Sequence, residues 1–211
     1  MELDPAVVDG LLSRLLHDLI GPVAATVNGI ELVEGFRGKN NASIADEAFD
    51  LIGLSARQTA DRLSYFRVAF GGAGNSQDHD LEVVRRLAEA YLDSRKINLR
   101  FSAEVTEAKK PGPGFAKTIL AAVFLMADAL PRSGTIWIEI DAGAGWTTTI
   151  TASGPGATIE PDSIAGLTGT ALCNPPTTRS VIGVIVGYTA RRFGMRPEPH
   201  GEPDLARVTF I

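Results

Sequence analysis

Apolar residues recur at every third or fourth position over two long segments near the start of the chain. The first segment runs from about residue 7 to residue 33, behind Asp4 and Pro5, which are typical of a helix cap and a first helical turn. The second begins near Ser43 and ends near Phe70, after a polar turn at residues 38–41. This period is typical of amphipathic helices. Two such helices with a short connection predict an antiparallel hairpin.

A glycine-rich stretch at residues 71–76 has the composition of a flexible linker, and the pattern after it is mixed. The expected elements are a helix at 81–92, a strand at 97–101, a helix at 115–130, a hairpin of strands at 135–140 and 146–152, a helix at 177–193 and a strand at 206–211. We therefore predict an α+β protein, with a helical hairpin domain in residues 1–72 and an α/β domain in residues 76–211. One sheet with helices on one face is the expected architecture, with Phe115, Trp137 and Trp146 in its core.

His17 lies in the middle of the first predicted helix, on the side that faces away from an apolar stripe. At about 100° of turn per residue, the stripe falls within roughly 60° of the direction opposite the imidazole. Its members are Val8, Leu12, Leu15, Leu19, Val23, Ile30 and Val33. The side of the histidine carries mostly small residues, namely Ser13, Gly21, Ala24 and Asn28. We interpret His17 as a reactive imidazole that a partner domain can approach, with the core behind it.

The residues beside His17 favour this interpretation. Asp18 can hold one ring nitrogen and thereby select the tautomer. Pro22 removes a backbone donor and tends to kink a helix, a local cost that suggests a shaped site. The alternative is a solvated histidine without a role, which is the commoner case for a lone histidine on a helix, and Asp18 is equally compatible with simple solvation.

The string from His17 to Val23, His-Asp-Leu-Ile-Gly-Pro-Val, resembles the H-box of sensor histidine kinases. The longer string from Leu15 to Leu32 is more similar to the ChpT-type histidine phosphotransferases of alphaproteobacteria. This resemblance implies a hairpin that forms a dimeric four-helix bundle, followed by a degenerate, Bergerat-like version of the kinase ATP-binding sandwich. An isolated hairpin cannot enclose its own apolar stripes, which independently predicts a homodimer.

The kinases hold nucleotide at three places, and the resemblance implies that all three are altered here. The magnesium-binding asparagine is missing from residues 124–130, where Asp128 is the lone carboxylate. The Asp-x-Gly-x-Gly loop appears as residues 152–156 with alanine in place of the acid, and we expect Gly154 to Gly156 to form an ordinary turn. The glycine-rich loop before the last helix reads Arg-Ser-Val-Ile-Gly-Val at residues 179–184. We predict a scaffold that lacks ATP-binding residues.

We therefore predict that His17 takes a phosphoryl group from the aspartyl phosphate of a response-regulator receiver domain and passes it to another receiver. Asp18 would orient the imidazole and compensate its positive charge. The resemblance implies that one donor is the receiver of a hybrid histidine kinase. It also implies that the receiver supplies magnesium, so that this chain needs no cofactor or metal of its own.

The partner-facing candidates lie around His17 and near the end of the second helix. They are Arg14, Ile20, Gly21, Ala24, Asn28, Arg62, Tyr65 and Phe66. For Arg14 the alternative is simple solvation, which is the commoner case for an exposed arginine, and the two aromatic residues fit the core of the bundle equally well.

Two other functions remain open. One is a sensor histidine kinase fragment with a diverged nucleotide site, which would label itself with ATP. The other is a non-catalytic dimeric adaptor in which the histidine is incidental. Replacement of His17 by alanine separates the adaptor from the relay.

The composition narrows the possible classes of protein to globular ones. The chain has 211 residues, 45% of them hydrophobic and 21% charged, as expected for one or two globular domains. Because no apolar run reaches about 18 residues and the N-terminus has no signal pattern, we expect a cytoplasmic protein without a membrane segment.

The net charge is −5, with the acid excess in the first 70 residues. The sequence has no basic stripe, zinc-ligand spacing or aromatic platform, which argues against nucleic acid as a direct partner. Cys173 is the single cysteine, so it has no internal disulfide partner. We assign no function to Cys173, His79 or His200.

Overall fold

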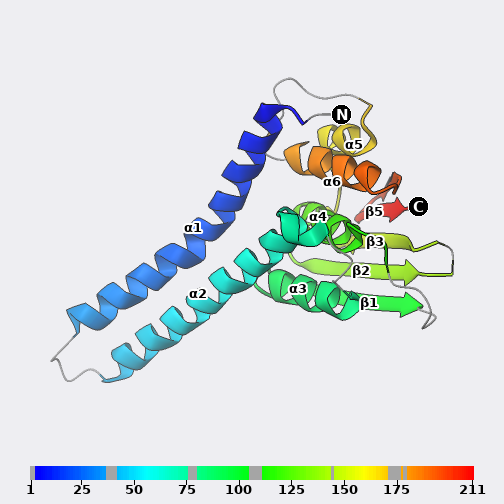
Figure 1. Cartoon of the computed structure of the whole chain (residues 1–211). Coiled ribbons are helices and arrows are strands. Elements are labelled where there is room, and N and C mark those ends of the chain that lie inside the picture. Colours follow the sequence, from blue (N-terminus) through cyan, green and yellow to red (C-terminus); the bar gives the residue numbers. More distant parts are fainter. Residues whose placement is uncertain are drawn as a thin grey trace.

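The chain folds into a helical hairpin that projects from an α/β domain (Figure 1). The computed structural model describes residues 3–36, 42–75, 80–104, 111–143, 145–170, 177 and 180–211. Helices α1 (Pro5–Gly35) and α2 (Ala42–Ala69) form the hairpin, close to the predicted bounds. Asp4 caps α1 as predicted, because its side chain accepts a hydrogen bond from the N–H of Ala6 at 2.8 Å. The predicted turn at 38–41, Cys173 and His79 lie outside the described residues.

The rest of the described chain forms a mixed sheet with helices on one side, which confirms the predicted α+β class. Its elements are the 3-10 helix η1 (Gly72–Asn75), α3 (Leu81–Asp93), β1 (Ile97–Glu104), α4 (Phe115–Asp128), β2 (Gly134–Asp141), β3 (Thr147–Ser153), α5 (Pro161–Thr168), α6 (Ser180–Arg192), β4 (Pro197–Glu202) and β5 (Leu205–Phe210). Within the described residues the sheet has five strands in the order β1-β2-β3-β5-β4, and only β1 and β2 run parallel.

Two of these elements were not predicted from the pattern. Helix α5 is only eight residues long, and its start signal is Pro161 in the first turn. Strand β4 contains Pro197 and Pro199, which favour a break rather than a strand. Prolines are tolerated in β4 because it is an edge strand, with β5 as its neighbour on one side only.

Helix α4 lies at the centre of the α/β domain. Apart from half-buried Lys117, its residues from Phe115 to Ala127 are buried. The helix packs between the sheet and helices α2, α3 and α6, which explains why its sequence is apolar on all sides.

The sheet has one covered face, and this corrects one core prediction. Ile136 and Ile138 of β2 point toward the helices and are fully buried. Trp137 lies between them and is 46% exposed, because successive strand residues point to opposite faces. The prediction for Phe115 is confirmed: it is buried and packs edge-on against the half-buried Trp146, with ring centroids 5.5 Å apart.

The base of the hairpin shares a core with the α/β domain. Val7 of α1 is buried, and Gly10 lies so close to α6 that an added Cβ would be 2.6 Å from Cγ2 of Val181. The last turns of α2 also enter this core. Residues 71–75, the described part of the predicted flexible linker, are packed against the domain: Gly74 is buried, and Nζ of Lys117 donates to the carbonyl oxygen of Gly71 at 2.9 Å.

Helix α1 carries apolar residues on two sides, and only one side is covered. Leu15 and Leu19 are half-buried against the core, in the direction of the predicted stripe. Val8, Leu12, Val23 and Ile30, which the pattern also placed in the core, are 41%, 52%, 46% and 45% exposed. The predicted stripe is therefore split, because α2 and the α/β domain cover only one flank of it.

Within the part of the chain that the structure describes, none of the helices combines the length and the apolar character that crossing a bilayer requires.

Candidate functional site

His17 lies on α1 near the base of the hairpin, with its imidazole directed to solvent. Its side chain is 78% exposed. The neighbours on the same side of the helix, Gly21, Ala24 and Asn28, are exposed and small. Ile20 is 65% exposed beside them. The structure therefore leaves the ring open to approach, and the partner-binding role of these four residues stays a prediction.

Asp18 points the other way, into the protein, and its side chain is only 8% exposed. Its Oδ2 accepts a hydrogen bond from Nη2 of Arg95 at 2.9 Å and lies 3.4 Å from the hydroxyl of Tyr91. Its Oδ1 lies 3.4 Å from Nη1 of Arg14 and 3.8 Å from Nδ1 of His17. The predicted hydrogen bond between His17 and Asp18 is therefore not formed in this geometry, although the two groups are adjacent.

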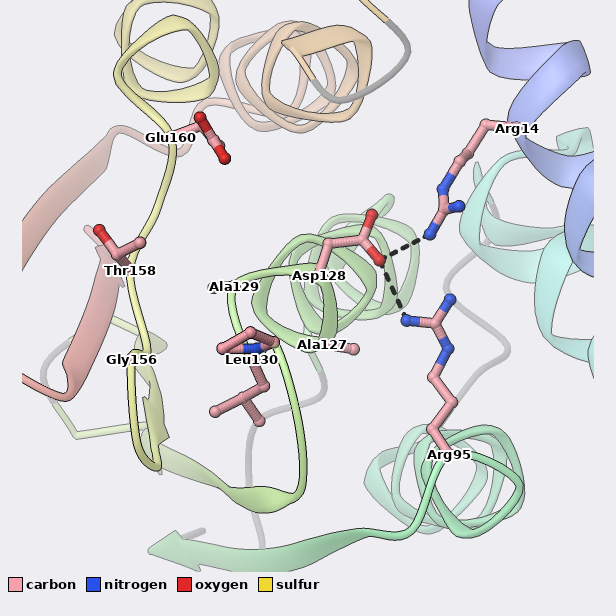
Figure 2. A pocket seen from close by; sticks show the side chains of 10 residues that line it. Arg14, Arg95, Ala127, Asp128, Ala129, Leu130, Gly156, Thr158 and Glu160 are labelled. Atoms are coloured by element: carbon pink, nitrogen blue, oxygen red, sulfur yellow. Dashed lines mark hydrogen bonds and ion pairs between the residues drawn. The ribbon is translucent and has the colours of Figure 1, made fainter.

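Four charged side chains form one cluster, which we call the charge cluster: Arg14, Asp18, Arg95 and Asp128. Oδ1 of Asp128 accepts hydrogen bonds from Nη2 of Arg14 at 2.7 Å and from Nη1 of Arg95 at 3.0 Å (Figure 2). The members come from α1, from the turn between α3 and β1, and from the end of α4. Two positive and two negative charges balance, as partly buried charges require.

Aromatic rings lie beneath the two guanidinium groups. Cζ of Arg95 is 5.1 Å from the ring centroid of Tyr91 and 5.7 Å from that of Phe124. Cζ of Arg14 is 5.4 Å from the Phe124 centroid. These distances permit cation–π attraction, which helps to hold both arginines in place.

Tyr65 and Phe66 belong to this aromatic layer, so their predicted role in partner binding is wrong. They are 0% and 7% exposed and lie in the core that α2 shares with the α/β domain. The ring of Tyr65 stacks on Tyr91 with centroids 4.3 Å apart, and its hydroxyl donates to the carbonyl oxygen of Leu120. Burial raises the pKa of both tyrosines well above the usual value, so their hydroxyls stay protonated at neutral pH.

Arg62 and Arg14 are both bound within the chain. Arg62 donates from Nη1 to the backbone carbonyl oxygen of Asp18, and its Nη2 lies 3.5 Å from Oγ of Ser94. Arg14 is held in the charge cluster. Any contact of these arginines with a partner, as predicted from the sequence, must compete with these bonds.

Sequence reasoning missed Arg95 as a neighbour of the histidine helix. Arg95 is separated from Asp18 by 77 positions, and no local pattern links them. Asp128 offered the one available signal, since a carboxylate in an otherwise apolar helix needs a positively charged partner.

Beside the charge cluster lies a pocket of about 360 Å³ between the end of α4 and the segment after β3 (Figure 2). Its lining includes Arg14, Arg95, Asp128, Gly156, Thr158 and Glu160. Among the described residues, no group of three or more potential metal-ligating side chains is found.

The glycines of the two altered loops have structural roles. The N–H of Ala157 donates to the carbonyl oxygen of Gly154 at 2.9 Å, which confirms the predicted turn. The N–H of Gly156 donates to Oδ1 of Asp204 at 2.7 Å, and the N–H of Gly154 donates to the Asp204 carbonyl oxygen at 3.1 Å. Gly183 lies inside α6, where an added Cβ would be 2.2 Å from the carbonyl oxygen of Ser163. Gly183 therefore allows α5 and α6 to approach closely.

Comparison with known proteins agrees with the resemblance seen in the sequence. The model of a family described as the histidine phosphotransferase C-terminal domain matches residues 81–198. Protein phosphotransferase ChpT of Brucella abortus (strain 2308) is 31% identical to this chain over 133 residues, which cover 62% of the chain and 59% of that relative. The match thus spans less than two thirds of the length of the relative.

A solved structure of a bacterial phosphotransferase matches the whole arrangement of hairpin and α/β domain. The comparison covers 100% of this chain and 98% of the other, with a TM-score of 0.79 and 25% sequence identity. Because the family model also covers more than half of the sequence, the chain belongs to the histidine phosphotransferase family.

Proposed function

We propose that the protein is a phosphorelay intermediate in which His17 carries a phosphoryl group between receiver domains of response regulators. The observation that carries the proposal is the pairing of an open imidazole with a buried, tethered carboxylate on the next residue. This arrangement suits a nucleophile that must be reached by another protein and still have its charge compensated. Membership in the phosphotransferase family supports the same function.

The orientation of the ring indicates which nitrogen reacts. Nδ1 is the nitrogen near Oδ1 of Asp18, at 3.8 Å, so Nε2 is left for the partner. The lone pair of Nε2 forms the N–P bond while the P–O bond of the receiver's aspartyl phosphate breaks. The bonding electrons return to the receiver carboxylate, and the ring keeps its proton on Nδ1. Asp18 then compensates the positive charge of the ring, and the reverse step loads a second receiver.

The surface around His17 suits a receiver domain. Gly21, Ala24 and Asn28 have small side chains that allow another domain to approach the ring closely. Ile20 supplies an exposed apolar contact beside them. Phosphoryl transfer requires mainly alignment and charge compensation. We propose that the receiver supplies its own Mg²⁺ and that one of the receivers belongs to a hybrid histidine kinase.

We also propose that the C-terminal domain works without ATP. Oδ1 of Asp128 is occupied by the guanidinium groups of Arg14 and Arg95, so the carboxylate is poorly placed to hold magnesium phosphate. The N–H of Gly156 is bound to Asp204 rather than directed at a phosphate.

A homodimer is the second part of the proposal. Large apolar side chains are exposed along both hairpin helices, and a groove between them is lined by Val23, Thr26, Val27, Ala56, Thr59, Ala60 and Leu63. Such a continuous apolar surface favours association. A second copy offers the same surface by twofold symmetry, and the two hairpins then form a four-helix bundle.

The experiment that tests the relay is transfer of ³²P from phosphorylated receivers to the full chain. We expect acid-labile label on the wild-type protein and none on the His17→Ala variant. His200→Ala is the matched control, because His200 is another exposed histidine beside a carboxylate, with Nε2 3.0 Å from Oε1 of Glu202. Label that survives in His17→Ala would contradict the proposal.

Two other outcomes would identify the alternatives. Self-labelling with ATP and magnesium at His17 would identify a kinase. A dimer that no receiver of the source organism labels would identify an adaptor.

A further inference from the structure

We propose that Arg95 is a positioning residue for the reaction of His17, acting through Asp18. In this inference, which rests on the proposed function, the α/β domain holds the carboxylate that orients the imidazole. The structural basis is a bridge: Arg95 binds Asp18 of α1 and Asp128 of α4 at the same time.

The bridge uses the forked geometry of the guanidinium group. Nη2 of Arg95 lies 2.9 Å from Oδ2 of Asp18, and Nη1 lies 3.0 Å from Oδ1 of Asp128. A lysine at this position would keep the charge but has one nitrogen, so it cannot reproduce both contacts with the same geometry. The side chain of Arg95 is 21% exposed, so the bridge is partly shielded from water.

The bridge determines which oxygen of Asp18 faces the histidine. Arg95 and the hydroxyl of Tyr91 both approach Oδ2. The other oxygen, Oδ1, lies 3.4 Å from Nη1 of Arg14 and 3.8 Å from Nδ1 of His17. A small rotation of the exposed ring brings Nδ1–H into hydrogen-bonding distance of Oδ1. That bond keeps the proton on Nδ1 and the lone pair on Nε2, the tautomer that the transfer step requires.

Loss of Arg95 would disturb this arrangement in two ways. The carboxylates of Asp18 and Asp128 would be left to share Arg14, which already contacts both of them. One partly buried carboxylate would then lack a full partner. The carboxylate of Asp18 would also lose the contact that selects its rotamer, so Oδ1 would no longer be held toward His17.

The test uses the full chain with the variants Arg95→Gln and Arg95→Lys. The matched control is Arg85→Gln, which removes an arginine that pairs with Glu82 and Glu89 on the surface of α3. The first readout is the rate of phosphoryl transfer over a range of receiver concentrations. For Arg95→Gln we expect the maximal rate to fall by roughly 10- to 100-fold. The receiver concentration at half-maximal rate should change little, because Arg95 does not form the docking surface. The maximal rate of Arg95→Lys should lie between those of Arg95→Gln and the wild type, and that of Arg85→Gln should match the wild type.

The second readout is the tautomer of His17, measured from the ¹⁵N chemical shifts of the ring in the free protein. We expect the Nδ1–H form to dominate in the wild type and in Arg85→Gln, and to lose population in Arg95→Gln. This measurement needs no receiver. A wild-type protein that no receiver labels would therefore refute the proposed function, while the tautomer would still decide the positioning role.

The inference is overturned if Arg95→Gln keeps the wild-type tautomer and maximal rate. It is equally overturned if the only kinetic change is a higher receiver concentration at half-maximal rate, since that would make Arg95 a docking residue. If Arg95→Gln does not fold, as judged by circular dichroism, the same two measurements on Arg95→Lys decide the matter.

Discussion

Arg62 donates a hydrogen bond to the backbone carbonyl oxygen of Asp18. In a regular helix this oxygen would accept a hydrogen bond from the N–H of residue 22, but residue 22 is proline and has no N–H. A proline inside a helix removes one hydrogen bond and leaves the carbonyl four residues earlier without its helical donor. Here α2 supplies the donor instead. The bond stabilises α1 at the turn that presents His17 and links the two hairpin helices at this level.

This relationship predicts a coupled effect on stability. Replacement of Arg62 by alanine should lower the free energy of unfolding by about 1–3 kcal/mol, because it leaves a partly buried acceptor unsatisfied. In a Pro22→Ala background the N–H of residue 22 can bind the Asp18 carbonyl, so the same replacement should cost less. Urea unfolding at one fixed protein concentration measures the free energy of unfolding of the wild type, the two single variants and the double variant, which together form a double-mutant cycle. Additive effects would show that the proline and the arginine act independently.

Gly21 should respond differently to small and large side chains. An added Cβ at Gly21 has no atom within 4 Å, so Gly21→Ala should stabilise the helix by roughly 0.5–1 kcal/mol. Gly21→Leu should keep the fold but raise the receiver concentration needed for half-maximal transfer, because a large side chain beside His17 blocks close approach. Unfolding curves and transfer kinetics on the two variants test both effects. Normal receiver binding by Gly21→Leu would place the docking surface elsewhere.

Leu63 should be important for the proposed homodimer. It lines the apolar groove of the hairpin and is 52% exposed in the single chain. A glutamate there would bury a charge against the second copy, so Leu63→Glu should be monomeric by sedimentation equilibrium. Leu54 is also 52% exposed. Because a helix turns by about 100° per residue, Leu54 lies on the side of α2 opposite Leu63. Leu54→Glu should therefore remain dimeric. A monomeric wild-type protein at tens of micromolar would refute the proposed dimer.

Tyr91 should make the fold sensitive to alkali. Burial raises its pKa in the folded state, whereas the unfolded chain has the usual value of about 10. The folded state therefore holds the proton more tightly, so the stabilisation is complete below about pH 10 and is lost as the pH rises toward the folded pKa. Urea unfolding between pH 8 and 11 should show this loss. Tyr91→Phe should show a smaller loss, and an unchanged pH slope would contradict the assignment. Tyr65 has the same direction of pKa shift and contributes to the part that remains.

Local signals in the chain suffice for the hairpin and for the open side of His17. The helical period, the Asp4 cap and the small residues around the histidine all act within a few turns of backbone, where neighbours in sequence are neighbours in space. The family resemblance rests on the same local string from Leu15 to Leu32.

The contacts around Asp18 required the folded chain. Arg95 is 77 positions from Asp18, and Asp128 is 114 positions from Arg14. Their pairing therefore depends on how the hairpin packs on the α/β domain, through α1 on α6 and α2 on α3 and α4. The burial of Tyr65 and Phe66 has the same origin, because periodicity places them on one face of α2 without saying which domain covers that face. The division of the apolar residues of α1 into a packed side and an exposed side likewise follows from packing. A helical pattern records which residues avoid water, whereas the partner that excludes the water is chosen by long-range packing.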